Sequence, residues 1–564
     1  MMIYRFGFNH SQENIQLLIF ITRFFYLVFI FSFIIKYLLS KDKLQYLTSN
    51  ALEGILILLV IYDGISYYLF GHPILEKLLI RLGINNYRSI YHFFIQFFLL
   101  FFVGIELVKS INSVYTSRLK PTTLFILSFV ILILGGGFLL TLPGCNYTGQ
   151  WLNFVDAVFT SASASCVTGL TVVNTATFFN VKGQLVILFL IQLGGIGILT
   201  FASFFASFMK KGIGIKHQIA MNELLDAENM SGSYFLIKRI LVMTFIIEAL
   251  GAIGIYVLWG DFQFSSTGEK IYASIFHSIS AFCNAGFSTL EYNFETPLAT
   301  ELYMLHIFMG VLIFFGGLGF PVIRDIFSPM QLRDRLMHPW KEWKLSSKVA
   351  VYTSIVLIVL GMAAFYFFYA DEKYADKSPI ALIAITFFQS VNLRTSGFNS
   401  INLENLPNIL ILISIFQMFI GASSASTGGG IKTSTFIVMM VAVIGTIRGK
   451  KEVSISNRTI AIELIYKAFA VVIFSGLFVL LATTLLTYFE PNLQPIRLAY
   501  EAVSAFATVG LTTGITSGLT DASKILLTIS MFIGRVGIIT LAYSLSTKAL
   551  TADFKYATTH MTIG

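Results

Sequence analysis

The sequence predicts an all-α polytopic membrane protein in which four fused repeats, each helix, pore helix, loop and helix, form a pseudo-fourfold arrangement. Of its 564 residues, 56% are hydrophobic and only 12% are charged, whereas soluble domains carry about 25% charged residues. Several stretches reach about 20 apolar residues, which is enough to cross the ~30 Å hydrocarbon core as a helix. A short glycine pattern also recurs along the chain. These observations favour a helical membrane protein over a soluble one.

The glycine pattern occurs four times, as "SASASCVTGLTVV", "SISAFCNAGFSTL", "QSVNLRTSGFNSI" and "SAFATVGLTTGIT". In each copy a small polar run precedes one glycine, which is followed by Leu or Phe. The glycines are Gly169, Gly286, Gly397 and Gly510, separated by 117, 111 and 113 residues. Self-similarity at a regular period indicates repeated structural units.

Every repeat has the same order of segments. A long apolar segment comes first, at residues 121–142, 233–258, 348–369 and 462–488. A half-apolar segment of roughly a dozen residues follows, which is too short to span and is therefore a re-entrant candidate. The glycine pattern is next, and a second apolar segment closes the repeat, at 182–209, 301–326, 407–447 and 523–546.

We divide the chain on this basis into pore repeats, which we call units one to four. Unit one covers residues 121–212, unit two 233–328, unit three 344–450 and unit four 459–550. Residues 1–120 hold extra apolar helices that go beyond the four-unit pattern, and residues 551–564 form a C-terminal tail.

The charges indicate an orientation. Loops that join one unit to the next are basic, with Lys210, Arg333 and Arg448 as examples, whereas loops beside the glycine patterns carry mainly acids such as Glu295 and Glu404. Lys and Arg mark the cytoplasmic side of a membrane. We therefore expect the glycine patterns to face outward and the C-terminus to be cytoplasmic. The same rule accounts for the net charge of +9 without nucleic-acid binding.

The glycine patterns predict an ion filter. Non-helical backbone at membrane depth is tolerated only where it lines a cavity or is buried in protein, and a ring of carbonyls can replace the hydration shell of a monovalent cation. Glycine adopts positive φ without a Cβ penalty. The alternative is close helix packing at small residues, but four matched loops favour a filter. Its candidate residues are Val167, Thr168, Gly169, Asn284, Ala285, Gly286, Thr395, Ser396, Gly397, Thr508, Val509 and Gly510.

Unit three contains a break, in "GASSASTGGGIKTST" from Gly421 to Thr435. Residues 407–447 as one straight helix would measure about 60 Å, twice the ~30 Å core, and glycine, serine and threonine disfavour helix. We expect an unwound loop over 421–430 that lies in the conduction path, just inside the filter, rather than a mere kink or a tail projecting into the cytosol. Its small residues are Gly421, Ser423, Ser424, Ser426, Thr427, Gly428, Gly429 and Gly430.

Arg535 occupies the corresponding level of unit four. A charge at membrane depth usually faces a cavity or a partner, so we predict that Arg535 repels cations and donates hydrogen bonds to carbonyls of this loop. Lys432 pairs with a carboxylate, points to cytoplasmic water or helps to support this loop. Arg394 is predicted to brace the third filter loop, and Asp156 and Glu501 to have structural roles.

Six sequence motifs follow one another along the chain: "VTGL" (Val167–Leu170), "NAGFS" (Asn284–Ser288), "RTSGFN" (Arg394–Asn399), "STGGGIK" (Ser426–Lys432), "TVGLTTG" (Thr508–Gly514) and "GRVGIITL" (Gly534–Leu541). With these motifs, which occur in the same order in the family, the chain resembles over residues 120–550 the Trk/Ktr/HKT superfamily of potassium transporters, in particular its bacterial Trk and Ktr branches. The resemblance implies a potassium-selective filter at the four glycines, with Gly169 looking like the potassium form.

The resemblance also implies that the small residues of 421–430 form an intramembrane gate, with Arg535 as the gating arginine. It further implies a homodimer in the bacterial plasma (inner) membrane, docked on cytosolic nucleotide-binding RCK-type regulatory subunits. K⁺ would be the transported ion, with no organic cofactor in this chain.

Two other functions were considered. A symporter that couples K⁺ to Na⁺ or H⁺ would typically show inverted repeats and midplane acids, whereas these repeats share one orientation and no acid lies in the glycine patterns. A membrane-embedded enzyme would be expected to carry catalytic motifs, but HExxH, GxSxG and GxxxxGK[ST] are absent. We therefore expect channel-like potassium uptake and no enzymatic activity.

Overall fold

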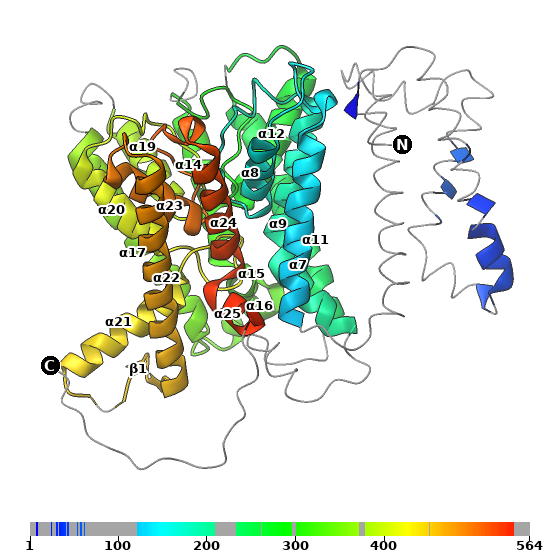
Figure 1. The fold of residues 1–564 in the computed structure, drawn as a ribbon. Helices are drawn as coiled ribbons and strands as arrows, with labels where there is room; N and C mark the ends of the chain where they lie inside the picture. Colours follow the sequence, from blue (N-terminus) through cyan, green and yellow to red (C-terminus); the bar gives the residue numbers. More distant parts are fainter. Residues whose placement is uncertain are drawn as a thin grey trace.

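The computed structural model describes residues 121–208, 233–260, 262–295, 301–370, 378–450 and 452–545, with a few residues between 7 and 62. Most of the predicted N-terminal helices and the whole 551–564 tail lie outside these described residues. The described part is a bundle of helices (Figure 1).

One order of elements occurs four times in this bundle. The first helices are α7 (Pro121–Leu140), α11 (Ser233–Leu258), α17 (Leu345–Phe365) and α22 (Ile462–Phe489). The short pore helices are α8 (Phe154–Ser165), α12 (Thr267–Phe282), α19 (Pro379–Asn392) and α23 (Pro495–Phe506). The second helices are α9 (Val181–Phe208), α14 (Tyr303–Leu318), α20 (Asn408–Phe419) and α24 (Asp521–Val536). The predicted fold class is confirmed.

Local sequence signals define where the pore helices begin. Asn153 caps α8 by accepting a hydrogen bond from the backbone N–H of Val155, and Ser266 caps α12 in the same way. Ser378 caps α19, whose first residue is a proline. These side chains satisfy backbone N–H groups that a helix start leaves free. Three pore helices therefore start at polar caps, whereas α23 starts at Pro495 without a side-chain cap.

Serine and glycine set the register between each pore helix and the first helix of units one to three. The serine hydroxyl donates to a first-helix carbonyl, and a glycine lies three residues after that carbonyl. A Cβ on the glycine would come within 2.5 Å of the serine oxygen, so the close contact requires glycine. The hydrogen bonds run from Ser161 to Ile133 (2.7 Å, beside Gly136), from Ser278 to Glu248 (2.6 Å, beside Gly251) and from Ser390 to Ile358 (2.7 Å, beside Gly361).

Two second helices end at a single glycine in the left-handed region. After α14, Gly319 has φ +86° and the chain turns by 106° into α15 (Phe320–Phe327). After α24, Gly537 has φ +88° and α25 (Ile538–Leu545) follows. The sequence segments 301–326 and 523–546 are therefore each divided into two helices, which corrects the expectation of one helix in each place.

The remaining elements connect the units. α16 (Pro329–Met337) lies between α15 and α17, and a π-helical turn over Tyr366–Ala370 continues α17. In unit three α21 (Thr433–Ile447) follows a break, and the hairpin β1 (Ser454–Ile455) and β2 (Arg458–Thr459) leads to α22. Single 3₁₀ turns occur at Pro143–Cys145 and Thr516–Gly518.

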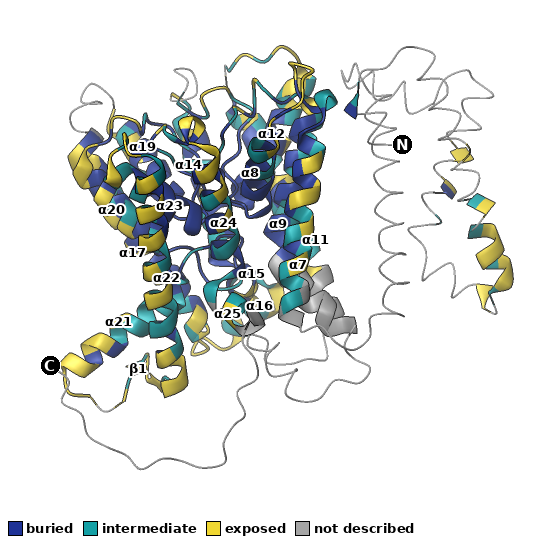
Figure 2. Cartoon of the chain, viewed as in Figure 1, coloured by how far each residue is buried: buried dark blue, intermediate teal, exposed yellow. Residues whose placement is uncertain are grey.

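The outer faces of the long helices are apolar and exposed, whereas the centre of the bundle is buried (Figure 2). In α22, Leu477 is 57% and Leu480 66% exposed, as expected for side chains that contact lipid. By length and composition, Arg239–Leu258, Leu345–Tyr369 and Ile462–Phe489 can cross a membrane, and the bent α14–α15 pair is a further candidate among the described residues.

Candidate ion pathway

Four loops of the same conformation follow the pore helices. We call them the glycine loops: 167–169, 284–286, 395–397 and 508–510. Their glycines have φ of +97°, +69°, +78° and +88°, and the residue two positions earlier is also left-handed in all four, with φ of +58°, +60°, +66° and +51°. A positive φ is uncommon outside glycine, so its recurrence at one position shows that the four loops are true structural repeats.

The glycine loops close a ring in chain order. A Cβ on Gly169 would lie 2.6 Å from the Ala285 carbonyl oxygen. A Cβ on each of the other three glycines would lie similarly close to a carbonyl oxygen: Gly286 to Ser396 at 2.5 Å, Gly397 to Val509 at 2.8 Å and Gly510 to Thr168 at 2.0 Å. Each glycine therefore lies against a carbonyl of the next unit, and unit four returns to unit one. All twelve predicted filter residues belong to this ring.

The pore helices support the ring through serine side chains. Ser163 accepts a hydrogen bond from the Gly169 N–H at 3.0 Å, and Ser504 does the same for Gly510 at 3.1 Å. In unit two, Ser280 donates to the Phe287 carbonyl at 2.8 Å. The C-terminal ends of the pore helices immediately precede the loops, and this end of a helix dipole favours a cation.

The break in unit three lies directly against two of the glycine loops. Helix α20 ends at Phe419 and α21 begins at Thr433, so the non-helical segment runs over 420–432, slightly longer than the predicted 421–430. We call it the unit-three loop. The Gly429 N–H donates to the Thr508 hydroxyl at 2.9 Å. A Cβ on Gly428 would lie 2.0 Å from the Thr395 hydroxyl oxygen, so the loop can approach this closely only because it is glycine-rich.

The bend in unit two holds the other side of the unit-three loop. The Ser423 N–H donates to the Gly317 carbonyl at 3.0 Å, and the Thr427 hydroxyl donates to the Gly316 carbonyl at 3.1 Å. In return, the Phe320 N–H donates to the Ala425 carbonyl at 3.3 Å. The sequence alone does not indicate this support, because the Gly-Gly-x-Gly of unit two, Gly316–Gly319, is equally typical of close helix packing.

Three cationic side chains donate to carbonyls of the unit-three loop. Arg535 donates through Nη1 to Thr427 and through Nη2 to Gly194 in α9 of unit one. Lys432 donates to the Gly428 carbonyl at 2.7 Å, so it bonds within the loop, as a supporting role requires, and not to a carboxylate. Arg394 donates to the Gly421 carbonyl at 3.3 Å. The predicted bracing of the third filter loop by Arg394 is therefore corrected: its bond goes to the unit-three loop.

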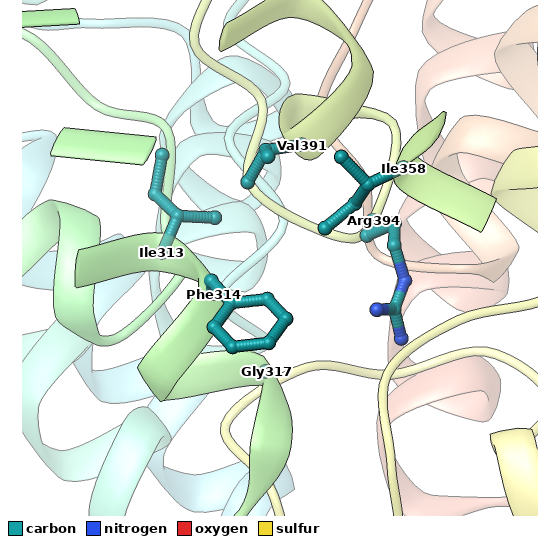
Figure 3. A pocket seen from close by; sticks show the side chains of 6 residues that line it. All are labelled: Ile313, Phe314, Gly317, Ile358, Val391 and Arg394. Atoms are coloured by element: carbon teal, nitrogen blue, oxygen red, sulfur yellow. The ribbon is translucent and has the colours of Figure 1, made fainter. Parts of the chain in front are cut away.

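Arg394 also lines a small cavity between α14, α17 and α19 (Figure 3). The cavity measures about 10 Å³, close to what a single water molecule requires. Within the described part of the chain, Nε of Arg394 has no hydrogen-bond partner. The guanidinium is thus only partly satisfied by its bond to Gly421.

The acids behind the ring have structural partners. Asp156 of α8 forms an ion pair with Lys524 of α24 at 2.7 Å, which joins unit one to unit four. Glu501 is fully buried and accepts hydrogen bonds from the loop after Gly510. These contacts agree with the structural roles expected for both acids.

Comparison with known proteins identifies the family. The family model for TrkH, described as a cation transport protein, matches residues 89–550. The chain belongs to the TrkH family of cation transport proteins. This TrkH family member is 37% identical over 446 residues to the potassium/sodium uptake protein NtpJ of Enterococcus hirae, covering 78% of this chain and 96% of the relative. It is 36% identical over 448 residues to the Ktr system potassium uptake protein B of Bacillus subtilis, with the same coverage of 78% and 96%.

A solved structure shares the fold of this TrkH family member. The potassium transporter TrkH from Vibrio parahaemolyticus superposes with a TM-score of 0.61 at 16% identity, covering 77% of this chain and 86% of that chain. The predicted family is therefore confirmed, and the protein is a polytopic membrane transporter and not an enzyme.

Proposed function

We propose that the protein takes up potassium ions through the ring of glycine loops. The observation that carries this proposal is the closed ring, in which the filter glycine of each unit lies against a backbone carbonyl of the next unit. Such carbonyls can replace the hydration shell of a monovalent cation. The names of the relatives support potassium as the ion, since both are potassium uptake proteins by name and one also names sodium.

The unit-three loop is the proposed gate. It lies against the glycine loops of units three and four and is held there by hydrogen bonds to units two and four. The positive charges of Arg394, Lys432 and Arg535 surround it and would oppose the passage of K⁺. In this account the described conformation is closed, and conduction requires the loop to leave its contacts.

We also propose the remaining features that the family resemblance implies. The protein would lie in the bacterial plasma membrane as a homodimer, with its C-terminus and the basic connection between α15 and α17 in the cytoplasm. Cytosolic nucleotide-binding RCK-type subunits would dock on that side and control the gate. The exposed Lys341 and Arg333 of this connection fit the charge distribution of a cytoplasmic surface.

Uptake of ⁸⁶Rb⁺ tests the proposed function. The full chain is expressed in a bacterial strain that lacks potassium uptake, with the empty vector as control. We expect saturable ⁸⁶Rb⁺ uptake that unlabelled K⁺ inhibits at lower concentration than Na⁺. Absence of uptake by protein present in the membrane, or equal inhibition by K⁺ and Na⁺, would contradict potassium uptake.

Coupled transport is the second candidate, because one relative is named for both potassium and sodium. Currents through the protein in liposomes separate the two. A reversal potential that follows the K⁺ gradient alone supports the channel-like mechanism, whereas a reversal potential that shifts with the Na⁺ or H⁺ gradient supports coupling.

A further inference from the structure

One position of the pore helices differs in chemistry from unit to unit. In units one to three it is the residue just before the serine that bonds to the first helix. In unit four Ala502 takes the place of that serine, and the position is the residue just before Ala502. All four side chains at this position are 0% exposed. They are Thr160, His277, Gln389 and Glu501.

In unit two this residue is bonded to the segment that leaves the glycine loop. Nδ1 of His277 lies 2.7 Å from the Ala273 carbonyl, which only accepts, so the hydrogen-bond network assigns the proton to Nδ1. Nε2 then accepts from the Ser288 hydroxyl at 2.9 Å. Ser288 is two residues after Gly286. The ring of His277 packs edge-on against Trp259 and Phe294, which fixes its orientation.

Unit four repeats this connection with a carboxylate. Oε1 of Glu501 accepts from the Thr512 hydroxyl at 2.7 Å and from the Thr513 N–H at 3.0 Å. Oε2 accepts from the Thr516 hydroxyl at 2.8 Å. Thr512 is two residues after Gly510, the same offset as Ser288 in unit two. An imidazole and a carboxylate therefore bind the same point of two different repeats.

Units one and three have another arrangement. The Thr160 hydroxyl donates to the Asp156 carbonyl, one turn back in its own helix, at 2.8 Å. Neither amide atom of Gln389 has a hydrogen-bond partner in the portion of the chain that the structure describes. The segments after Gly169 and Gly397 are thus not bonded to their pore helices from this position.

The two bonded units are diagonal in the ring, because the glycine contacts run from unit one to two, three, four and back to one. We propose that His277 and Glu501 are positioning residues that brace opposite walls of the filter and thereby maintain its preference for K⁺ over Na⁺. This inference rests on the proposed filter function. One bond from each brace ends two residues beyond the filter glycine, so its loss loosens that wall while the ring residues stay unchanged. A wall free to move can adapt to a smaller ion, which lowers discrimination.

The experiment removes the hydroxyl that each brace binds two residues beyond the filter glycine, without changing the brace itself. Ser288→Ala and Thr512→Val delete the donor, whereas Ser288→Thr and Thr512→Ser retain it. Thr160→Val is the matched control in unit one, and Gln389→Met is the control in unit three. ⁸⁶Rb⁺ uptake is measured for each full-length variant against increasing K⁺ or Na⁺.

We expect Ser288→Ala and Thr512→Val to reduce the K⁺/Na⁺ preference by about tenfold, the upper range for one hydrogen bond. The hydroxyl-retaining variants and both controls should stay within about twofold of wild type. The double variant His277→Ala/Ser288→Ala should have the same K⁺/Na⁺ preference as Ser288→Ala alone, because the two substitutions remove the same hydrogen bond.

An unchanged K⁺/Na⁺ preference in Ser288→Ala and Thr512→Val proteins that still take up ⁸⁶Rb⁺ would overturn the proposed role of His277 and Glu501. So would an equal loss in Thr160→Val, since that result would show general sensitivity of the pore helices. A wild-type protein without K⁺ preference would instead contradict the proposed filter. The two failures are therefore distinguishable.

Discussion

Arg535 joins the unit-three loop to unit one, because its guanidinium donates to the Thr427 carbonyl through Nη1 and to the Gly194 carbonyl through Nη2. It is 3% exposed, so both bonds lie inside the protein. A planar guanidinium can hold two separate carbonyls at fixed angles, which an ammonium group does less well. Arg535 thus couples the position of the proposed gate to a helix of another unit.

Replacing Arg535 should open the pathway. In Arg535→Gln the charge and the ability to donate to two separate carbonyls are lost. We expect initial ⁸⁶Rb⁺ uptake to rise by roughly tenfold, because a hydrogen bond from a charged donor contributes more free energy than one from a neutral donor. Arg535→Lys retains the charge and should give an intermediate rise. Uptake equal to or below wild type in a normally folded Arg535→Gln protein would count against the gate.

Arg394 should affect the gate and not the filter. Arg394→Ala loses the bond to the Gly421 carbonyl, so we expect about a threefold rise in ⁸⁶Rb⁺ uptake with K⁺/Na⁺ preference unchanged. Inhibition curves for both ions on the same variant measure the two quantities together. A loss of preference with no rise in uptake would restore the role as a filter brace that the sequence suggested.

Gly510 of the ring should not tolerate a methyl group. Gly510→Ala would place Cβ 2.0 Å from the Thr168 carbonyl oxygen at a left-handed φ, and we expect ⁸⁶Rb⁺ uptake to fall by more than about tenfold. Gly135→Ala in α7 is the control, because nothing lies within 4 Å of its Cβ. If Gly510→Ala transported as well as Gly135→Ala, the close approach in the ring would be wrong.

The ion pair of Lys524 and Asp156 should stabilise the closure between the last and the first unit, which no peptide connection joins directly. Their side chains are 10% and 17% exposed. Lys524→Met should lower the unfolding free energy by about 2 kcal/mol, between the values for exposed and buried pairs. Thermal unfolding in detergent measures this change. The double variant Lys524→Met/Asp156→Asn should recover part of the loss, and strictly additive losses would show that the pair is not coupled.

The glycine spacing was sufficient to predict the repeats and the residues of the ring, because positive φ and close backbone approach both require glycine. The bend in unit two was not predictable from local sequence. Gly-Gly-x-Gly also occurs at Gly194–Gly197, where α9 continues as a helix, whereas in unit two Gly319 ends α14. A Cβ on Gly319 would lie 2.7 Å from the Ser424 carbonyl oxygen of the unit-three loop. The difference therefore lies in tertiary contacts.

The carbonyls to which the buried Arg394 and Lys432 donate could not be predicted from the sequence either. Arg394 adjoins a glycine loop in the chain, which suggested a bond within its own unit's filter, but its side chain reaches the break of the same unit some 27 residues later. Lys432 likewise bonds back to Gly428, within its own loop. Carbonyls that a broken helix leaves free can accept such bonds, and their positions follow only from the path of the unwound backbone.

The most direct test of the central claim, that the ring of glycine loops selects potassium, is the ion preference of Gly169→Ser. A Cβ at this position would lie 2.6 Å from the Ala285 carbonyl oxygen, so the serine must displace a carbonyl of the ring. The measurement is inhibition of ⁸⁶Rb⁺ uptake by K⁺ and by Na⁺ in wild type and variant. We predict that Gly169→Ser still takes up ⁸⁶Rb⁺ but loses the preference for K⁺. Wild-type preference in the variant would contradict the assignment of the ring as the filter.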